Sequence, residues 1–252
     1  MMIASAVRES LTRLGSQAWR TPNRIPTLRH GELHVWLFPI DRSREHVLGP
    51  TLSQDEVERA GKFKRAGDRA DFVVCRGALR FLLGHYAGLE PASVQIFYTE
   101  DGKPFVDNSA TSLKFNLSHS QEYALFGFGL GFDMGVDIEQ IDGNVIDQGM
   151  LSHCLHDNEL EIYNSLSVDE KAAFFFKCWT RKEAYLKLRG DGFAVSPTEI
   201  DLLSMQGIEF GFDGDPACFT ELPHINAYAA TIATRTKPQN ISCYKLDSSL
   251  FR

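Results

Sequence analysis

The heptapeptide GVDIEQI, which begins at Gly135, contains two carboxylates in an otherwise apolar run. Side chains alternate along an extended chain, so Val136 and Ile138 point to one side of it. Asp137 and Glu139 point to the other side, about 7 Å apart. A strand with a solvated outer face would explain a lone D-x-E. The functional alternative is a site for a hard cation, because two close carboxylates repel each other unless a metal ion or a proton relieves them.

A third carboxylate lies in the segment KCWTRKEAYLKLRGDGF, which begins at Lys177. Glu183 and Lys187 are four residues apart, so they lie on one face of a helix. A surface ion pair is the simple explanation, and such a pair is worth only about 0.3–0.5 kcal/mol. Trp179 lies one turn before Glu183 and makes this face partly apolar. Glu183 is therefore a candidate metal ligand.

Several basic and hydroxyl side chains could bind an anion. Lys103 lies in the turn-forming segment DGKP, where its ammonium group could reach a phosphate, although a lysine in an exposed turn is commonly just solvated. In FNLSHS, Ser118 points away from the apolar side of an expected strand and His119 follows it, where a structural histidine is the ordinary explanation. Arg59 precedes a helix with an arginine stripe, which alone would be a solvated face.

The elements that must position these residues follow from hydrophobic periodicity. Apolar residues three or four positions apart predict helices over residues 68–86 and 168–189, the second ended by Gly190 in the left-handed conformation. Apolar and alternating runs predict strands over residues 33–40, 94–99, 113–118, 123–128, 134–139, 227–234 and 241–246. Each half of the chain thus combines strands with one long helix. We therefore expect an α+β fold of two similar lobes.

The expected organisation has three parts. Residues 1–30 form an N-terminal extension, residues 31–133 an N-terminal α+β lobe, and residues 134–252 a C-terminal α+β lobe that carries the metal site. The first residues are rich in arginine and faintly resemble an organelle transit peptide, but a loosely attached extension is the preferred interpretation.

Composition excludes several classes of protein. The 252 residues are 43% hydrophobic and carry a net charge of −7, which suits a globular protein and disfavours a general nucleic-acid binder. Five scattered cysteines without a C-x-x-C pair favour a reducing compartment, and no run has the length of a membrane span. We expect a cytoplasmic monomer that binds neither nucleic acid nor membrane. G-x-S-x-G, P-loop and dinucleotide-binding motifs are absent from the sequence.

The order of five segments is more specific than any one of them: SQDEVERAGKF, GKP, FNLSHS, GVDIE and WTRKEAYLKLRGDGF. From Leu52 to Phe193 this order resembles the surfactin-type (Sfp-like) 4′-phosphopantetheinyl transferase family. The resemblance implies a pseudo-dimer of two α+β lobes, each with a small, mostly antiparallel sheet and a long helix, with coenzyme A between them. It implies an enzyme that transfers 4′-phosphopantetheine from coenzyme A to a serine of an apo acyl, peptidyl or polyketide carrier protein and releases adenosine 3′,5′-bisphosphate.

The same resemblance implies roles for the acidic residues and one lysine. Asp137, Glu139 and Glu183 would hold Mg²⁺, with Mn²⁺ as an alternative, against the pyrophosphate of coenzyme A. Glu183 and Lys187 are the expected catalytic residues. Glu183 is also a candidate general base for the carrier serine, directly or through a water molecule.

The coenzyme A contacts implied by the resemblance come from both halves of the chain. Lys103, Ser118, His119 and Lys187 match family positions that contact its phosphates. Arg59 matches a basic position near the 3′-phosphate of the adenosine. The family often has another basic residue near the position of Glu56, so the acidic residue here puts the binding of the 3′-phosphate in question.

Two further functions stay open. A module that binds coenzyme A or a carrier protein without turnover would retain the site, although an idle site has no reason to keep carboxylates that repel one another. A Mg²⁺-dependent phosphohydrolase acting on nucleotides would explain the carboxylates. It would not explain basic positions spread over both halves.

Overall fold

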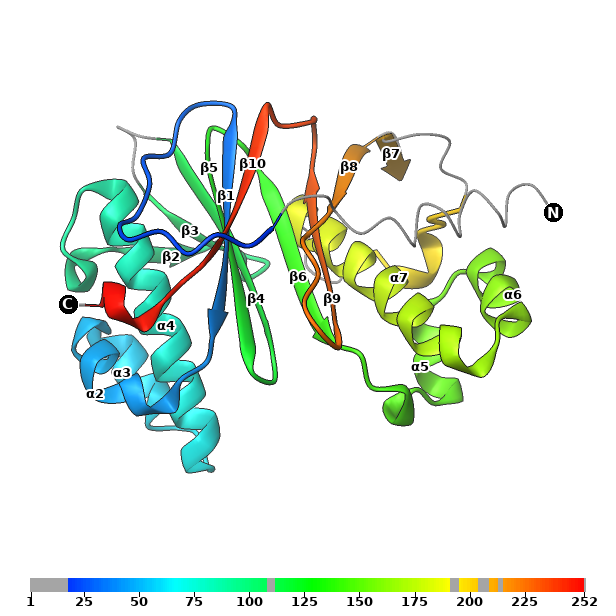
Figure 1. The fold of residues 1–252 in the computed structure, drawn as a ribbon, viewed down its shortest axis with the longest axis horizontal. Helices are drawn as coiled ribbons and strands as arrows, with labels where there is room; N and C mark the ends of the chain where they lie inside the picture. Colours follow the sequence, from blue (N-terminus) through cyan, green and yellow to red (C-terminus); the bar gives the residue numbers. More distant parts are fainter. Residues whose placement is uncertain (1–17, 108–111, 191–194, 204–208, 213–214, 252) are drawn as a thin grey trace.

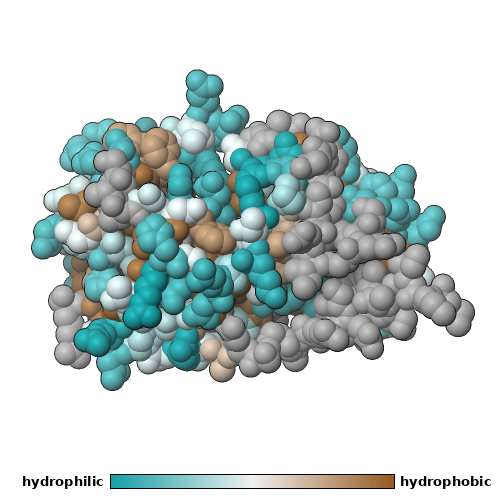
Figure 2. Space-filling view, turned by 90° about the horizontal axis from the view of Figure 1, so that it is seen from above, coloured by the Kyte–Doolittle hydropathy of each residue, from teal (hydrophilic) through white to brown (hydrophobic). Residues whose placement is uncertain are grey.

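Two four-stranded sheets lie face to face at the centre of the molecule, and a long helix covers the outer face of each (Figure 1). This computed structural model describes residues 18–107, 112–190, 195–203, 209–212 and 215–251. The layers therefore run helix, sheet, sheet, helix. Seen from above, the described surface is mostly hydrophilic, with small apolar areas between polar side chains (Figure 2).

The first sheet has the strand order β10-β1-β5-β4. Its strands are β1 (Glu32–Pro39), β4 (Leu113–Ser120), β5 (Tyr123–Leu130) and β10 (Asn240–Lys245). β1 pairs with β10 in parallel, and the other pairs are antiparallel. The 22-residue helix α4 (Ala66–Ala87) packs Leu79, Leu82 and neighbouring apolar residues against this sheet. The same lobe contains α2 (Glu45–Leu48), α3 (Gln54–Ala60) and the hairpin of β2 (Ile96–Tyr98) and β3 (Pro104–Val106).

The second sheet has the strand order β6-β9-β8-β7 and is antiparallel throughout. Its strands are β6 (Met134–Gln140), β7 (Glu209–Phe212), β8 (Asp215–Glu221) and β9 (Tyr228–Thr234). The 22-residue helix α7 (Val168–Arg189) covers it, and α5 (Gln148–Cys154) and α6 (Asp157–Ser165) lie beside α7. A capping box of Ser167 and Glu170 begins α7, and Gly190 ends it with a φ of 79°.

Six short 3-10 helices complete the described elements: η1 (Arg42–Arg44), η2 (Gly49–Thr51), η3 (Pro91–Ser93), η4 (Gly143–Val145), η5 (Pro197–Glu199) and η6 (Ser248–Leu250). Among the residues that the structure describes, none of the helices combines the length and the apolar character needed to cross a bilayer.

The expected α+β fold is confirmed, and each lobe has one four-stranded sheet and one 22-residue helix. The predicted helix over residues 168–189 matches α7 at both ends. The division into lobes at residues 133–134 stays a prediction. The strand β10 comes after this division in the sequence but belongs to the first sheet, because it pairs with β1. Helices and strands can be predicted from local periodicity, whereas the partner of a strand depends on distant residues.

The described end of the N-terminal extension is attached to both lobes. The backbone N–H of Arg20 donates to the carbonyl of Cys243 on β10 over 3.0 Å. Trp19 Nε1 donates to the carbonyl of Pro223 over 3.1 Å. Residues 1–17 lie outside the described part of the chain, so the predicted loose attachment concerns mainly residues that are not described.

A buried histidine links β1 to α4 in the first lobe. His34 is 3% exposed, and its Nδ1 lies 2.8 Å from the hydroxyl of Tyr86, which also accepts a hydrogen bond from Trp36 Nε1. Burial, with a smaller contribution from the positive charge of Arg20, lowers the pKa of His34 from 6.5 to about 4. His34 is therefore neutral in the folded protein at pH 7.

This shift makes the stability of the fold depend on pH. Between pH 6.5 and 4 the unfolded chain binds a proton at His34 that the folded chain does not bind. Its contribution to the free energy of unfolding is therefore complete above pH 6.5 and is lost as the pH falls towards 4, by about 3 kcal/mol in all. Urea unfolding of the wild type and of His34→Gln should show a stability difference that shrinks from pH 7 to pH 4. A constant difference would contradict the prediction.

Candidate active site

The candidate site lies where β4, at the edge of the first sheet, meets β6, at the edge of the second. These strands belong to different sheets, and side chains join them in place of a backbone ladder. Three side chains at alternate positions of β4 hydrogen-bond to β6 over 2.7–2.9 Å: Asn116 Oδ1 with Val136 N, Ser118 Oγ with Asp137 Oδ1, and Ser120 Oγ with Glu139 Oε2. These bonds set the register of the two lobes at the site.

Helix α7 crosses β6 at Gly135 with the two backbones in contact. A Cβ atom at Gly135 would overlap the carbonyl oxygen of Ala184 and would lie 2.5 Å from the backbone nitrogen of Leu188. Only glycine permits this approach. It brings Glu183 and Lys187, the chain neighbours of these two residues, against the side of β6 that carries its carboxylates.

Asp137 is the centre of the polar contacts. Lys187 Nζ donates to Asp137 Oδ1 over 2.7 Å and to Ser118 Oγ over 2.9 Å. Asp137 is 2% exposed, and its Oδ2 atom is buried with no hydrogen-bond partner among the described residues. Burial raises the pKa of Asp137, and the charge of Lys187 opposes this shift. The second oxygen therefore remains available to a ligand.

The three predicted metal ligands line one cavity of about 330 Å³, together with Trp179 and Lys187. Burial raises the pKa of Glu139, and repulsion by Asp137 raises it further. Burial also raises the pKa of Glu183, with further contributions from Asp137 and Glu139. Burial thus disfavours the charged forms of three neighbouring carboxylates, and a divalent cation with oxygen ligands would stabilise those charged forms.

Within the described residues, no group of three or more His, Cys, Asp or Glu side chains has the arrangement that would hold a metal ion. Repulsion between like charges favours carboxylates that stay apart. One oxygen of Asp137 and one of Glu139 are already held by Ser118 and Ser120. The ligand set therefore remains a prediction that the shared cavity and the unpaired Asp137 oxygen support.

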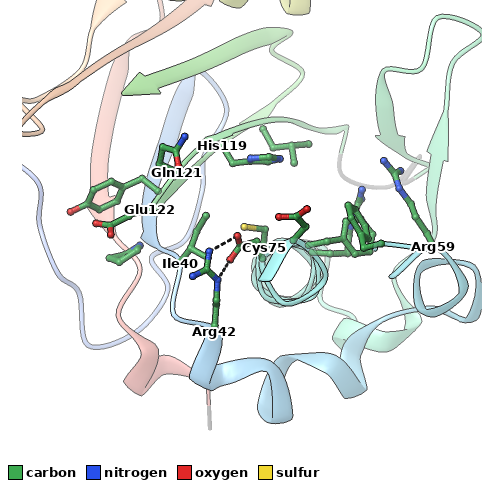
Figure 3. A pocket seen from close by; sticks show the side chains of 15 residues that line it. Ile40, Arg42, Arg59, Cys75, His119, Gln121 and Glu122 are labelled. Atoms are coloured by element: carbon green, nitrogen blue, oxygen red, sulfur yellow. Dashed lines mark hydrogen bonds and ion pairs between the residues drawn. The ribbon is translucent and has the colours of Figure 1, made fainter. Parts of the chain in front are cut away.

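A groove of about 1000 Å³ runs along α4 and the turn between β4 and β5 (Figure 3). Arg59 lies at one end of it, with its guanidinium group 5.2 Å from the centre of the Phe72 ring. His119 lines both this groove and the carboxylate cavity. Partial burial lowers the pKa of His119, and the charge of Lys187 lowers it further. The Arg59 groove and the carboxylate cavity therefore share His119 as a wall.

Glu56 does not reverse the charge of this groove. It is 4% exposed and does not line the groove, because its side chain turns inwards between α3 and α4. There it accepts a hydrogen bond from Arg80 Nε, lies 3.5 Å from Arg76 Nε and forms a capping box with Ser53. Arg76 lines the groove, so α4 adds a cation near Arg59 that sequence reasoning treated only as part of a helix stripe.

Lys103 lies at the C-terminal end of α7 and does not line the carboxylate cavity. Its Nζ donates to the backbone carbonyl of Leu188, at the C-terminal end of α7, over 2.9 Å. It lines a smaller cavity of about 290 Å³ that also contains Glu183 and Lys187. The structure thus brings together the predicted residues of β4, β6 and α7, with Arg59 at the far end of the groove and Lys103 at the end of α7.

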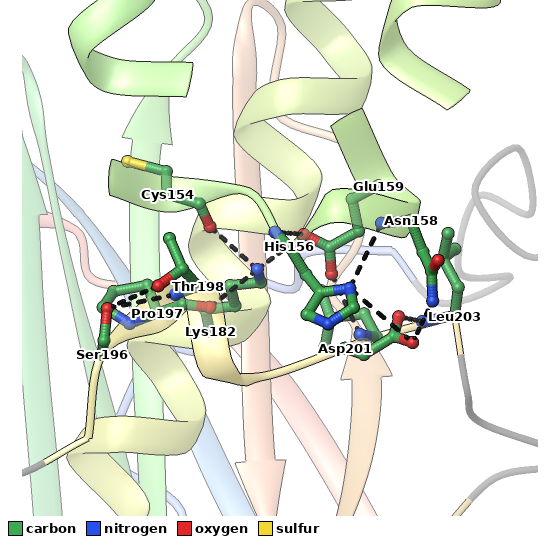
Figure 4. A network of polar contacts seen from close by, with 11 residues as sticks. Cys154, His156, Asn158, Glu159, Lys182, Ser196, Pro197, Thr198, Asp201 and Leu203 are labelled. Carbon is green, nitrogen blue, oxygen red and sulfur yellow. Dashed lines mark hydrogen bonds and ion pairs between the residues drawn. The ribbon is translucent and has the colours of Figure 1, made fainter. Parts of the chain in front are cut away.

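A buried ion pair that sequence reasoning missed supports α7 from its other side (Figure 4). Lys182 and Glu159 are both 0% exposed, and Lys182 Nζ lies 2.6 Å from Glu159 Oε2. Lys182 also donates to the carbonyls of Cys154 and Pro197, and Glu159 accepts from the backbone N–H of Leu202. Lys182 is thus anchored in the lobe, while the next residue, Glu183, faces the site. In the sequence, Lys182 is adjacent to Glu183, but this adjacency does not identify Glu159 as the partner of Lys182.

Comparison with known proteins gives two family matches that together cover most of the chain. Residues 133–233 match the 4′-phosphopantetheinyl transferase superfamily. Residues 40–127 match the family described as 4′-phosphopantetheinyl transferase, N-terminal.

Three curated proteins are similar to the chain over much of its length. The 4′-phosphopantetheinyl transferase HetI of Nostoc sp. is 38% identical over 185 residues, which are 69% of this chain and 78% of HetI. The putative 4′-phosphopantetheinyl transferase slr0495 of Synechocystis sp. is 31% identical over 63% of this chain and 65% of its own length. The 4′-phosphopantetheinyl transferase gsp of Aneurinibacillus migulanus is 27% identical over 62% of this chain and 63% of its own length. The last two alignments span slightly less than two thirds of those relatives.

Proposed function

Because the chain belongs to the 4′-phosphopantetheinyl transferase superfamily, we propose that it transfers 4′-phosphopantetheine from coenzyme A to a serine of an apo carrier protein. The other product is adenosine 3′,5′-bisphosphate, and the acceptor is an acyl, peptidyl or polyketide carrier protein. The single observation that carries the proposal is the cavity shared by Asp137, Glu139 and Glu183 beside Lys187. Their carboxylates come from a strand and a helix that the close contact at Gly135 holds together.

The three carboxylates fit a divalent cation. The unpaired, buried Oδ2 atom of Asp137 and the raised pKa values of Glu139 and Glu183 are the features that support this assignment. Bound Mg²⁺ supplies charge neutralisation at the pyrophosphate and at the leaving group. Mn²⁺ prefers similar oxygen ligands and is the alternative to Mg²⁺ at this site.

The basic and hydroxyl groups orient coenzyme A along the groove. Lys187, Ser118 and His119 are placed to bind the pyrophosphate next to the carboxylates. His119 can donate a hydrogen bond to a phosphate from a ring N–H. Arg59, which forms no ion pair with another described residue, is placed to bind the 3′-phosphate at the far end.

Glu183 is the group placed to take the proton of the carrier serine. It lines both the carboxylate cavity and the smaller cavity beside Lys103, and its carboxylate can accept a proton from a hydroxyl group. The serine oxygen forms a bond to the phosphorus on the pantetheine side. The bond from that phosphorus to the leaving adenosine bisphosphate breaks, and Glu183 receives the serine proton directly or through water.

The decisive experiment is a mass assay on carrier proteins. Incubation with coenzyme A, Mg²⁺ and an apo carrier protein is expected to add one phosphopantetheine to the carrier. EDTA should abolish the gain, because the carboxylates would then repel the pyrophosphate, and added Mg²⁺ should restore it. Tight binding of coenzyme A without a mass gain on any of several carriers would favour a binding module. Release of pantetheine phosphate without a carrier would favour a phosphohydrolase.

The proposal includes the setting in which the protein acts. It acts as a cytoplasmic monomer and binds neither nucleic acid nor membrane. The five cysteines, all buried thiols, and the net charge of −7 support this setting.

A further inference from the structure

The side chain of Lys103 joins the two lobes at a point that the proposed chemistry does not use. It starts from the turn between β2 and β3 in the first lobe and ends on the carbonyl oxygen of Leu188 in the second lobe, 2.9 Å away. The last four carbonyls of a helix lack partners within the helix. A cation is also favoured at a helix C-terminus by the helix dipole. Lys103 supplies α7 with both a hydrogen-bond donor for one of these carbonyls and a positive charge at its C-terminus.

The turn holds Lys103 firmly on the first lobe. Its backbone N–H donates to Thr99 Oγ1 over 3.0 Å, and its carbonyl accepts from the backbone N–H of Thr99, also over 3.0 Å. Gly102 precedes it with a φ of 83°, a conformation that glycine adopts without strain. Pro104 follows and begins β3. The ammonium group therefore extends from a fixed base.

The end of α7 is shaped to receive this side chain. A Cβ atom at Gly190 would lie 2.9 Å from Lys103 Cδ, so the lysine chain packs directly against the glycine that ends the helix. Gly190 itself donates to the carbonyl of Leu186 over 2.9 Å. Both bonds help to close the last turn of α7, one from the end of the helix itself and one from the opposite lobe.

We propose that Lys103 is a positioning residue, an inter-lobe latch that fixes the C-terminal turn of α7 and thereby aligns Lys187 with β4. This inference rests on the proposed function for its effect on catalysis. Lys187 immediately precedes Leu188, whose carbonyl the latch holds, and Lys187 Nζ reaches Ser118 on the same lobe as Lys103. The latch also forms one wall of the cavity of about 290 Å³ that contains Glu183. A direct contact of Lys103 with phosphate is the competing role.

Amide hydrogen exchange of the ligand-free protein distinguishes a positioning role of Lys103 from a direct contact with phosphate. Lys103→Met keeps the length and apolar stem of the side chain but removes the donor. In the ligand-free protein, amide exchange over residues 186–190 is expected to become about tenfold faster, because the last turn of α7 loses the hydrogen bond to the carbonyl of Leu188. In the transferase assay kcat should fall about five- to tenfold, with the KM for coenzyme A changed less than about twofold.

Two further variants complete the test. Lys103→Arg retains a cationic donor and should restore both slow exchange and kcat. Lys237→Met removes an exposed lysine between β9 and β10 and should leave both unchanged. Wild-type exchange rates in Lys103→Met, with a raised KM for coenzyme A and an unchanged kcat, would overturn the latch and favour the phosphate contact. If amide exchange is faster in Lys103→Met but the wild-type protein transfers no phosphopantetheine, the latch is retained and the proposed function is refuted.

Discussion

Replacing Gly135 by alanine is expected to lower transferase activity by about 100-fold or more and to destabilise the protein by about 1–3 kcal/mol. The added methyl group would overlap the carbonyl oxygen of Ala184 and would lie 2.5 Å from the backbone nitrogen of Leu188. Both are backbone atoms of α7 and cannot turn aside as a side chain can. The helix must therefore move away from β6 and carry Glu183 and Lys187 with it. Thermal unfolding and single-turnover transfer to a carrier protein measure the two effects.

Gly67 provides the matched control for this substitution. It lies in the first turn of α4, and a Cβ atom there would meet nothing within 4 Å. Gly67→Ala should retain activity and should stabilise the helix by up to about 1 kcal/mol. Wild-type activity and stability in Gly135→Ala would show that α7 does not depend on this close contact and would refute the proposed origin of the site geometry.

The site lies where two lobes meet that each bury their own core, and both polar and apolar side chains connect them. Alternate residues of β4 hydrogen-bond to β6, and Lys187 of α7 bonds to both Ser118 and Asp137. Apolar residues of β1 and β5 pack against those of β6 and β9 in the layer between the sheets. The carboxylates therefore lie at the edge of this interface, where a small relative movement of the lobes would change every polar contact at once.

The sequence predicts the parts of this site that depend on local pattern. Alternation in GVDIE places Asp137 and Glu139 on one side of a strand, and the spacing of Glu183 and Lys187 places them on one helix face; the strand and the helix are both confirmed. That these carboxylates share one metal ion stays a prediction. The resemblance supplied the assembly of these elements, because periodicity alone carries no information about which strand meets which helix.

Contacts between distant residues could not be predicted in this way. Glu56, at a position where the family often has a basic residue, put the binding of the 3′-phosphate in question, yet it pairs inside the lobe with Arg80, 24 residues away. Lys182 pairs with Glu159 and also donates to the carbonyls of Cys154 and Pro197. The residues next to Lys182 in the sequence give no indication of these partners. The need for Gly135 likewise depends on a helix about 50 residues later in the chain. Such residues become interpretable only when the packing is known.

Glu183→Gln is expected to lower kcat for carrier modification by about 10²- to 10⁴-fold, since the amide cannot accept the serine proton. The substitution keeps the size of the side chain and one oxygen, so the fold should be unaffected. If Glu183 also holds the cation, the affinity for Mn²⁺, measured by electron paramagnetic resonance without substrates, should fall together with kcat. Removing one of three carboxylates leaves less negative charge to bind a divalent ion.

The comparison of kcat with Mn²⁺ affinity assigns the role of Glu183. A lower kcat with unchanged Mn²⁺ affinity would mean that Glu183 accepts the proton of the serine and that Asp137 and Glu139 bind the cation without it. Glu161→Gln is the matched control, because Glu161 is an exposed carboxylate on α6 in the same lobe and should change neither quantity. Wild-type kcat in Glu183→Gln would contradict both roles. The carboxylate that α7 holds over β6 would then be a structural feature, and the proton of the carrier serine would have to leave by another route.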